Sequence, residues 1–379
     1  MRIGIDASLA ALRGTGTGRY AALLVERLLA LDGDDEFVLY FRANDQTDNP
    51  LFRLRGPRVT ATVTDAPLTL MRIHANLPWR LARDRVDLYH SLGFFLPWLW
   101  RGRTVVSIHD IHPVIQSQYW GGQGTRAAHL MLRSHIPLAI RQARRIVTPS
   151  DYVKRTLREE YGVPPEKIVV APNGTDPFFL EPPAPDALAA ASARMGADRF
   201  LLYVGALAPH KNVAGLVRAF ARLPLGGAER LRLALVGASV GRYQDEVLVP
   251  LIRELGLGDR VVLTGYVDDE RLRALYHCAT ALVLPSFGEG FGLPVLEAMA
   301  CGTAVVTSRV TALPEAAGDA ALYVDPTKPD DIAAAMACLL EDETRRQDLI
   351  KRGRARALTF TWDRSAAQVL RAYREATAP

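Results

Sequence analysis

The chain has 379 residues, of which 49% are hydrophobic and 23% are charged, a composition typical of globular proteins that excludes a disordered one. Its length exceeds what one hydrophobic core comfortably holds, so we expect two domains. The three cysteines lack the spacing of a metal site. No apolar run reaches the roughly 18 residues of a membrane-spanning helix, and no secretory signal precedes the first expected strand. These features favour a cytoplasmic protein.

Short apolar, β-branched segments alternate with amphipathic segments along nearly the whole chain. The apolar segments predict strands at 2–7, 36–41, 59–64, 86–91, 103–110, 144–150 and 167–173, and in a second series at 199–207, 231–238, 260–267, 280–286, 303–308 and 321–325. Segments between them, such as 20–31, 212–223 and 330–342, have helical periodicity. This alternation indicates an α/β protein with two Rossmann-like parallel sheets, each covered by helices on both faces.

A proline-rich segment at 171–190 separates the two series and marks the domain boundary. We expect an N-terminal domain over 1–172 and a C-terminal domain over 173–360. Residues 361–379 form a further helix that either caps the second domain or crosses back to the first, and we favour the crossing. Ligands of open parallel sheets bind beyond the carboxyl ends of the strands, so two such sheets facing across a deep cleft would line it with strand-to-helix loops.

Two loops of the first domain carry candidate residues. Gly14, Gly16 and Gly18 precede a helix expected to start near Arg19, and glycine amides before a helix can approach an anion closely. Arg19 stands where the dinucleotide fingerprint needs glycine, so an ordinary tight turn remains an alternative. His109 ends a strand at the expected cleft, where it would hydrogen-bond a sugar hydroxyl or serve as an ordinary loop histidine.

In the second domain, Lys211 lies just before Asn212, a candidate N-cap of the next helix. An ammonium group beside free helix amides makes a good diphosphate clamp. The chain has only five lysines and otherwise uses arginine. We therefore interpret Lys211 as a binding residue, with an ordinary surface lysine as the alternative.

The segment 285–306, PSFGEGFGLPVLEAMACGTAVV, places Glu289 among glycines after a strand and Glu297 in what we expect to be the first turn of a helix. The backbone amides of Phe291, Gly292 and Leu293 would point at a ligand between the two acids. A nucleotide sugar has hydroxyls at both ends and phosphates in the middle, and it fits this pattern. Acids that complement a helix dipole would explain Glu297 but not Glu289.

This segment resembles the signature of the retaining glycosyltransferases of family 4, in which seven residues separate two glutamates. The motifs YVGALAPHKN, LTGYVDDERLRALYHCA, VTPSDYVKRTL, VAPNGTDPFF, SIHDIHP and GTGTGRY resemble that family in its usual order, over nearly the whole chain. The resemblance implies the GT-B fold, a nucleotide-sugar donor held mainly by the C-terminal domain, and an acceptor held mainly by the N-terminal domain. It also implies transfer with retention of configuration and without a metal ion or other cofactor.

The resemblance assigns roles to individual residues. Glu289 matches the glutamate at the donor sugar, Glu297 the ribose-binding glutamate, Lys211 the diphosphate lysine and His109 the active-site histidine, while Gly16 and Gly18 match the loop over the phosphates. The backbone around Val267 matches the site of the base. One position departs: Ala206 stands where many members have a second diphosphate-binding arginine.

Residues 53–145 contain fourteen arginines against four acids, together with Trp79, Trp98, Trp100 and Trp120. Arginine with interfacial aromatics favours contact with an anionic membrane and a sugar or lipid-linked acceptor, which would place the protein at the inner face of the plasma membrane. A general preference for arginine in this chain is the alternative. Although the isoelectric point is about 9.2, no basic–aromatic repeat or recognition helix predicts nucleic-acid binding.

We therefore predict a hexosyltransferase, with GDP-mannose slightly favoured over UDP-sugars as donor, in cell-surface polysaccharide or glycolipid synthesis. Two alternatives remain: a sugar-nucleotide 2-epimerase of the same architecture, and a catalytically silent partner subunit, for which Ala206 is the argument.

Overall fold

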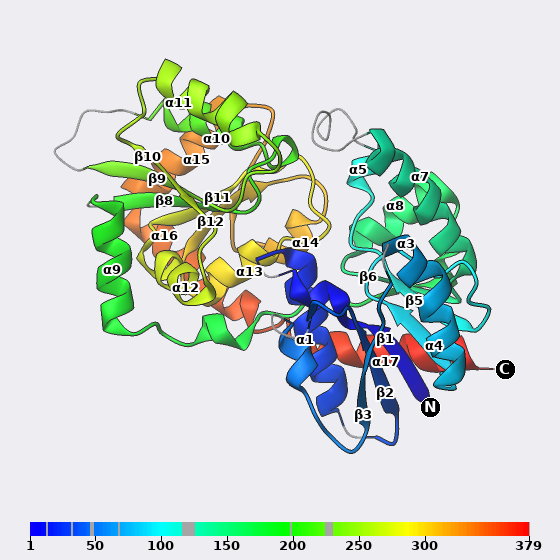
Figure 1. The fold of residues 1–379 in the computed structure, drawn as a ribbon. Coiled ribbons are helices and arrows are strands. Elements are labelled where there is room, and N and C mark those ends of the chain that lie inside the picture. Colours follow the sequence, from blue (N-terminus) through cyan, green and yellow to red (C-terminus); the bar gives the residue numbers. More distant parts are fainter. Residues whose placement is uncertain are drawn as a thin grey trace. The chain divides into compact units, whose positions relative to one another are not determined.

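The computed structural model describes residues 1–12, 14–31, 33–45, 49–66, 69–115, 126–197, 199–223 and 230–378. Trp120 lies outside these residues. The described chain divides into two compact units (Figure 1). The first unit contains the residues up to 115, residues 126–174 and the last helix, and the second unit contains Thr175–Phe360.

The first unit is built on a seven-stranded parallel sheet in the order β3-β2-β1-β4-β5-β6-β7. The strands are β1 (Arg2–Asp6), β2 (Glu36–Phe41), β3 (Val59–Val63), β4 (Leu88–Ser91), β5 (Arg103–Ser107), β6 (Arg145–Thr148) and β7 (Ile168–Val170). All seven strands predicted from sequence before the proline-rich segment are confirmed. The strand order reverses between β1 and β4, and in open parallel sheets ligands bind beyond the carboxyl ends of the strands at such a reversal.

The main helices of the first unit are α1 (Gly16–Ala30), α4 (Leu77–Arg83), α7 (Arg126–Gln142), α8 (Asp151–Tyr161) and α17 (Trp362–Thr377). The shorter ones are η1 (Ala7–Ala11), η2 (Pro50–Arg53), α3 (Thr69–Met71), the π-helix η3 (Arg72–Asn76), α5 (His112–Ile115) and η4 (Pro165–Lys167).

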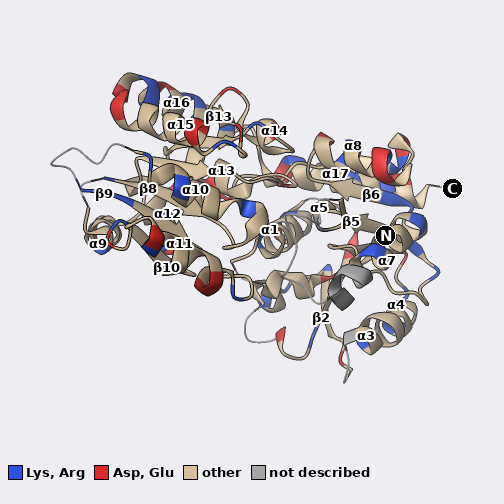
Figure 2. Ribbon diagram, turned by 90° about the horizontal axis from the view of Figure 1, so that it is seen from above, with Lys and Arg blue, Asp and Glu red and all other residues tan. Residues whose placement is uncertain are grey.

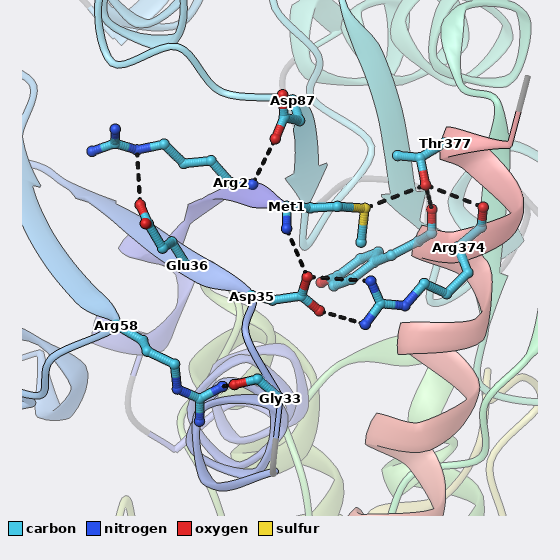
Figure 3. A network of polar contacts seen from close by, with 10 residues as sticks. Met1, Arg2, Gly33, Asp35, Glu36, Arg58, Asp87, Arg374 and Thr377 are labelled. Atoms are coloured by element: carbon cyan, nitrogen blue, oxygen red, sulfur yellow. Dashed lines mark hydrogen bonds and ion pairs between the residues drawn. The ribbon is translucent and has the colours of Figure 1, made fainter.

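Although α17 is last in the chain, it packs within the first unit, against α1 and the strands β5 and β6. Trp362 and Tyr373 bury their rings there. Figure 3 shows the outer end of this contact, where the guanidinium of Arg374 donates to both carboxylate oxygens of Asp35, at 2.7 and 3.2 Å, just before β2. A bidentate arginine–carboxylate pair sets the position of the helix more tightly than a single contact would.

The second unit has a six-stranded parallel sheet in the order β10-β9-β8-β11-β12-β13. Its strands are β8 (Arg199–Val204), β9 (Leu231–Val236), β10 (Val261–Gly265), β11 (Ala281–Leu284), β12 (Ala304–Ser308) and β13 (Leu322–Val324). The predicted second series of strands is thus confirmed as well. Here the strand order reverses between β8 and β11, so the same rule places a ligand of this unit beyond the carboxyl ends of those strands.

The main helices of the second unit are α9 (Pro185–Met195), α10 (Val213–Phe220), α11 (Val249–Glu254), α12 (Asp269–Cys278), α13 (Leu293–Ala300), α14 (Leu313–Ala317), α15 (Pro329–Glu341) and α16 (Glu343–Ala357). The shorter ones are η5 (Pro177–Leu180), η6 (Pro209–Lys211) and the π-helix η7 (Gln244–Leu248).

Each unit has its own apolar core, as the strand sequences require. In the second unit Leu201, Leu233 and Val283 are fully buried, and in the first Val106 and Ile146 are. Charged residues gather on the outer helices instead, as Figure 2 shows for α8 and α16. Parallel strands buried on both faces leave only their loops free to carry chemistry.

Candidate functional site

The loops after β8 and β11 lie at the reversal of strand order in the second unit, and they bring Lys211 and Glu289 together. The Lys211 ammonium donates to both carboxylate oxygens of Glu289, at 2.7 and 2.8 Å. Both side chains are mostly shielded, with exposed fractions of 19% and 12%. An ammonium group has three hydrogens, so one remains for a further acceptor after Glu289 has taken two.

Two residues that sequence reasoning missed orient Glu289. The hydroxyl of Ser286 donates to one carboxylate oxygen at 2.9 Å, and the backbone N–H of Glu289 donates to the hydroxyl of Thr311 at 3.1 Å. Ser286 adjoins the glycine-rich segment and is visible there in the sequence, whereas no local pattern points to Thr311. The glutamate is therefore held by its side chain and by its backbone.

Asn212 ties the two loops together. It stands at the start of α10, as predicted, but the expected capping bond is absent: its side chain donates instead to the carbonyls of Pro285 and Pro326, at 3.0 and 2.7 Å. The prediction of a capping side chain was wrong because the backbone of Asn212 is left-handed, with φ 56°. The amide group nevertheless lies against the first turn of the helix, where a β-carbon on Gly215 would be 2.2 Å from its Oδ1.

Helix α13 begins at Leu293 after Gly292, whose φ is 111°. The left-handed backbone favours glycine here, and a β-carbon on Gly292, 2.9 Å from the end of the Leu313 side chain, would also force that side chain to shift. Glu297 is the fifth residue of α13 and not part of its first turn, which corrects the predicted placement. Its buried carboxylate accepts a hydrogen bond of 2.9 Å from the hydroxyl of Tyr276, a third residue that the sequence did not indicate.

The loops after β9 and β10 also meet at this edge of the sheet. The N–H of Gly237 donates to the carbonyl of Gly265 at 3.0 Å, and Val267 is buried beyond it. The carbonyl of Ala206 accepts from the buried hydroxyl of Tyr203 at 2.8 Å. Position 206 is therefore fixed in the loop, but it supplies no cation.

In the first unit, α1 begins at Gly16, three residues earlier than expected, because the Thr15 hydroxyl accepts from the N–H of Gly18 at 3.0 Å and caps the helix. Gly16 and Gly18 therefore belong to the first turn of α1 and not to a loop before it. A β-carbon on Gly18 would lie only 2.1 Å from the carbonyl oxygen of Leu12, so this close approach requires glycine.

His109 follows β5 and is held on two sides. Its Nε2 lies 2.8 Å from the carbonyl oxygen of Leu92, and its ring meets the Tyr20 ring edge-on at 4.5 Å. A carbonyl only accepts, so Nε2 carries the proton and Nδ1 presents a lone pair. Burial lowers the pKa of His109 although the Leu92 carbonyl and Asp110 oppose the shift, and the ring is therefore neutral near pH 7.

Within the second unit, Lys211 is thus paired with Glu289, whereas the Glu297 carboxylate is hydrogen-bonded to a different residue, Tyr276. Within the first unit it connects His109 to the helix of Gly16 and Gly18. Among the described residues, no group of three or more His, Cys, Asp or Glu side chains is placed to hold a metal ion. None of the described helices combines the length and apolar composition that crossing a membrane requires.

Comparison with known proteins adds independent findings. Residues 14–178 match the family model described as Glycosyltransferase Family 4, and residues 175–356 match Glycosyl transferases group 1. The O-antigen chain mannosyltransferase B of Escherichia coli is 32% identical over 372 residues, which cover 95% of this chain and 96% of that protein. The D-inositol 3-phosphate glycosyltransferase of Nocardiopsis dassonvillei is 35% identical over 313 residues, which cover 78% and 72%. A sucrose-phosphate synthase from Thermosynechococcus elongatus superposes with a TM-score of 0.78 at 25% identity, covering 99% of this chain and 98% of that one.

Proposed function

This chain belongs to the group 1 glycosyl transferases of family 4 and is a hexosyltransferase with a GT-B fold, and on that premise we propose which sugar it moves, from what and to what. The donor is a nucleoside-diphosphate hexose, with mannose favoured. The acceptor is a saccharide or a lipid-linked saccharide of a cell-surface polysaccharide or glycolipid. Mannose is favoured because O-antigen chain mannosyltransferase B is similar to this chain over nearly its whole length.

The observation that carries the proposal is the Lys211–Glu289 pair at the reversal of strand order. The remaining N–H of Lys211 suits a diphosphate oxygen, and the fixed carboxylate of Glu289 suits the hydroxyls of the donor sugar. Glu297 would hold the ribose, and the amides of Phe291, Gly292 and Leu293 the phosphates. The backbone at Val267 would border the base.

The proposed chemistry is a front-face displacement that retains the configuration of the sugar. The bond from the anomeric carbon to the diphosphate oxygen breaks while the acceptor oxygen bonds to the same face. The proton of the acceptor hydroxyl passes to the leaving diphosphate. Lys211 and the amides before α13 stabilise the negative charge that grows there, so the proposed reaction uses no metal ion. Nδ1 of His109 would accept a hydrogen bond from a donor-sugar hydroxyl.

A thermal-shift panel of GDP-, UDP-, ADP- and TDP-sugars tests the donor. We expect GDP-mannose to raise the melting temperature of the protein and Glu297→Ala to abolish the shift. The matched control Glu254→Ala changes an exposed glutamate on α11 and should show the same thermal shift as the wild type. If no nucleotide sugar raises the melting temperature of the wild-type protein, the lack of an arginine at Ala206 prevents donor binding despite the other site residues. The silent-partner alternative is then favoured.

An exposed apolar surface in the first unit supports a lipid-linked acceptor. Trp79, with an exposed fraction of 57%, and Met71 lie on the helical stretch 69–83, and Trp98, with 49%, comes from the loop after β4. The guanidinium of Arg83 lies 5.2 Å from the centre of the Trp79 ring. Cations beside exposed aromatics suit an anionic leaflet. Trp100, in contrast, is buried and belongs to the core.

Flotation with anionic and zwitterionic liposomes, in low and high salt, tests this surface. We expect salt-sensitive binding to anionic liposomes that Trp79→Ser weakens. The control Leu358→Ser replaces an equally exposed apolar residue of the second unit and should bind like the wild type. Binding that is absent, or independent of Trp79, rules out this membrane contact.

A further inference from the structure

A buried chain of hydrogen bonds runs through the first unit beneath His109, and the proposed chemistry does not use it. The hydroxyl of Tyr373 on α17 lies 2.7 Å from Nδ1 of His90 on β4. Nε2 of His90 lies 2.9 Å from the hydroxyl of Ser107 on β5. The Ser107 hydroxyl lies 2.7 Å from that of Tyr20 on α1. All four side chains are buried.

Such a chain is costly unless it is satisfied throughout, since a buried polar group without a partner loses its hydrogen bonds to water and gains none in return. Burial lowers the pKa of His90 to about 3, with a smaller contribution from nearby His109, so the imidazole is neutral in the folded protein. A neutral imidazole has one donor and one acceptor, so both its contacts are used and the ring has one orientation. The chain therefore links four elements rigidly.

Tyr20 is the end of this chain that reaches the candidate site. It follows Gly18 by two residues on α1, and the edge contact with His109 has an angle of 79° between the rings. The Trp362 ring lies on another side of Tyr20, with the ring centres 6.1 Å apart. The Tyr20 ring is thus held by its hydroxyl and by its neighbours, and it forms one wall of the His109 position.

We propose that Tyr20 is a positioning residue for His109: its ring fixes the orientation of the imidazole, and the chain through Ser107, His90 and Tyr373 fixes the ring of Tyr20. This proposal rests on the proposed function only in giving His109 a contact with the donor sugar. The Nε2–H of His109 donates to the Leu92 carbonyl, and the ring packs edge-on against Tyr20. The Nδ1 lone pair therefore points in one direction. A sugar hydroxyl then meets a prearranged acceptor.

The same contact shields His109 from water. Within the first unit, the titratable groups that act on His109 are Asp110 in its own loop and His90 below it, and the ring of Tyr20 covers one side. If this ring is replaced by a smaller side chain, water reaches the imidazole and its charged form becomes less unfavourable. The pKa of His109 should then rise toward the ordinary value of histidine.

The test uses the full-length protein with Tyr20→Leu, Tyr20→Phe and the control Tyr40→Phe, whose buried hydroxyl bonds Asp84 on another part of the sheet. NMR titration of the His109 ring is one readout, and the dependence of kcat on pH is the other. Tyr20→Leu should raise the pKa of His109 and reduce kcat by roughly 10- to 100-fold with a smaller change in KM for the donor. Tyr20→Phe should keep the pKa lowered and reduce kcat less, and Tyr40→Phe should change neither.

Because the titration needs no donor, it separates this proposal from the proposed function. An unchanged His109 titration in folded Tyr20→Leu overturns the positioning role, whether or not transfer is measured. If Tyr20→Leu does not fold, Tyr20→Phe and Ser107→Ala decide the question through the His109 ring signals. Shifted signals in both support the chain, and unshifted signals in both overturn it.

Discussion

Lys211 and Glu289 neutralise each other before any ligand is bound. The pair is shielded, and Ser286 adds a second donor to one of the carboxylate oxygens. A dianionic diphosphate must therefore share the ammonium with Glu289 or displace it. For a donor bound as proposed, the pair would hold both groups in place, but it would also compete with that donor for the cation.

Glu289→Gln should separate these two effects. We expect transfer to fall by roughly 10²- to 10³-fold, because the amide is a weaker acceptor for the sugar hydroxyls in the transition state. The nucleoside diphosphate alone should bind at least as tightly as to the wild type, because Lys211 is released from its ion pair. Steady-state kinetics and calorimetric titration with the nucleoside diphosphate measure the two effects, with Glu254→Gln as the control. Loss of nucleotide binding would instead mean that Glu289 mainly holds the loops together.

The two helices that follow β8 and β11, α10 and α13, both begin after a residue with a left-handed backbone, Asn212 and Gly292 respectively. Such a residue turns the chain sharply between the end of a strand and the first turn of a helix. At Gly292 a β-carbon would force the adjacent Leu313 side chain to shift. Asn212, in contrast, has a side chain in this conformation, and its amide group donates hydrogen bonds to the carbonyls of two other loops.

Replacing Asn212 by glycine and by alanine distinguishes backbone strain from lost hydrogen bonds. Both variants lose the bonds to Pro285 and Pro326, at a cost of about 1 kcal/mol for each bond. Alanine, unlike glycine, is additionally destabilised by the left-handed backbone conformation, by about 1–2 kcal/mol. We therefore expect Asn212→Ala to be less stable than Asn212→Gly by about 1 kcal/mol in urea unfolding followed by circular dichroism. Equal stability would show that the backbone relaxes at this position.

At the scale of the whole molecule, the two units can be followed separately. All five tryptophans lie outside residues 175–360. Trp79, Trp98, Trp100 and Trp362 belong to the first unit, so their fluorescence reports on that unit, whereas circular dichroism reports on both. The first unit also contains His90, a fully buried histidine on the central part of its sheet.

Acid should destabilise the first unit through His90. The pKa of His90 is lowered from 6.5 to about 3 by burial, so only the unfolded chain takes up a proton as the pH falls from 6.5 toward 3. The free energy of unfolding should drop by about 1.4 kcal/mol per pH unit in that range, or about 2 kcal/mol between pH 7 and pH 5. Urea unfolding monitored by tryptophan fluorescence at both pH values measures this loss.

His90→Gln provides the comparison for this measurement. Glutamine keeps a donor and an acceptor but does not titrate, so the variant should lose less stability between pH 7 and pH 5, even if it is less stable at both. Asp6, whose pKa stays below its usual value of 3.8 because Arg72 outweighs its burial, contributes only at lower pH. An unchanged pH dependence in His90→Gln would assign the acid sensitivity to other groups.

The sequence alone determined the strands, the family and the positions of the candidate site residues along the chain. Apolar runs, glycines and helix periodicity are local patterns, and the parallel α/β rule places strand-to-helix loops at one edge of each sheet. For this reason Lys211, Glu289 and His109 could be proposed as site residues before any contact was known. The exact helix starts were less accessible, because Thr15 and Gly292 set them through specific bonds and backbone angles.

Only the tertiary structure decided which side chains meet. Strand order places β8 beside β11 and so pairs Lys211 with Glu289, 78 positions apart, and the packing of α17 brings Tyr373 to His90, 283 positions away. The difference between exposed Trp79 and buried Trp100 is likewise invisible in composition. Periodicity reports the environment of a residue within its own element, whereas contacts between elements depend on how the whole chain packs.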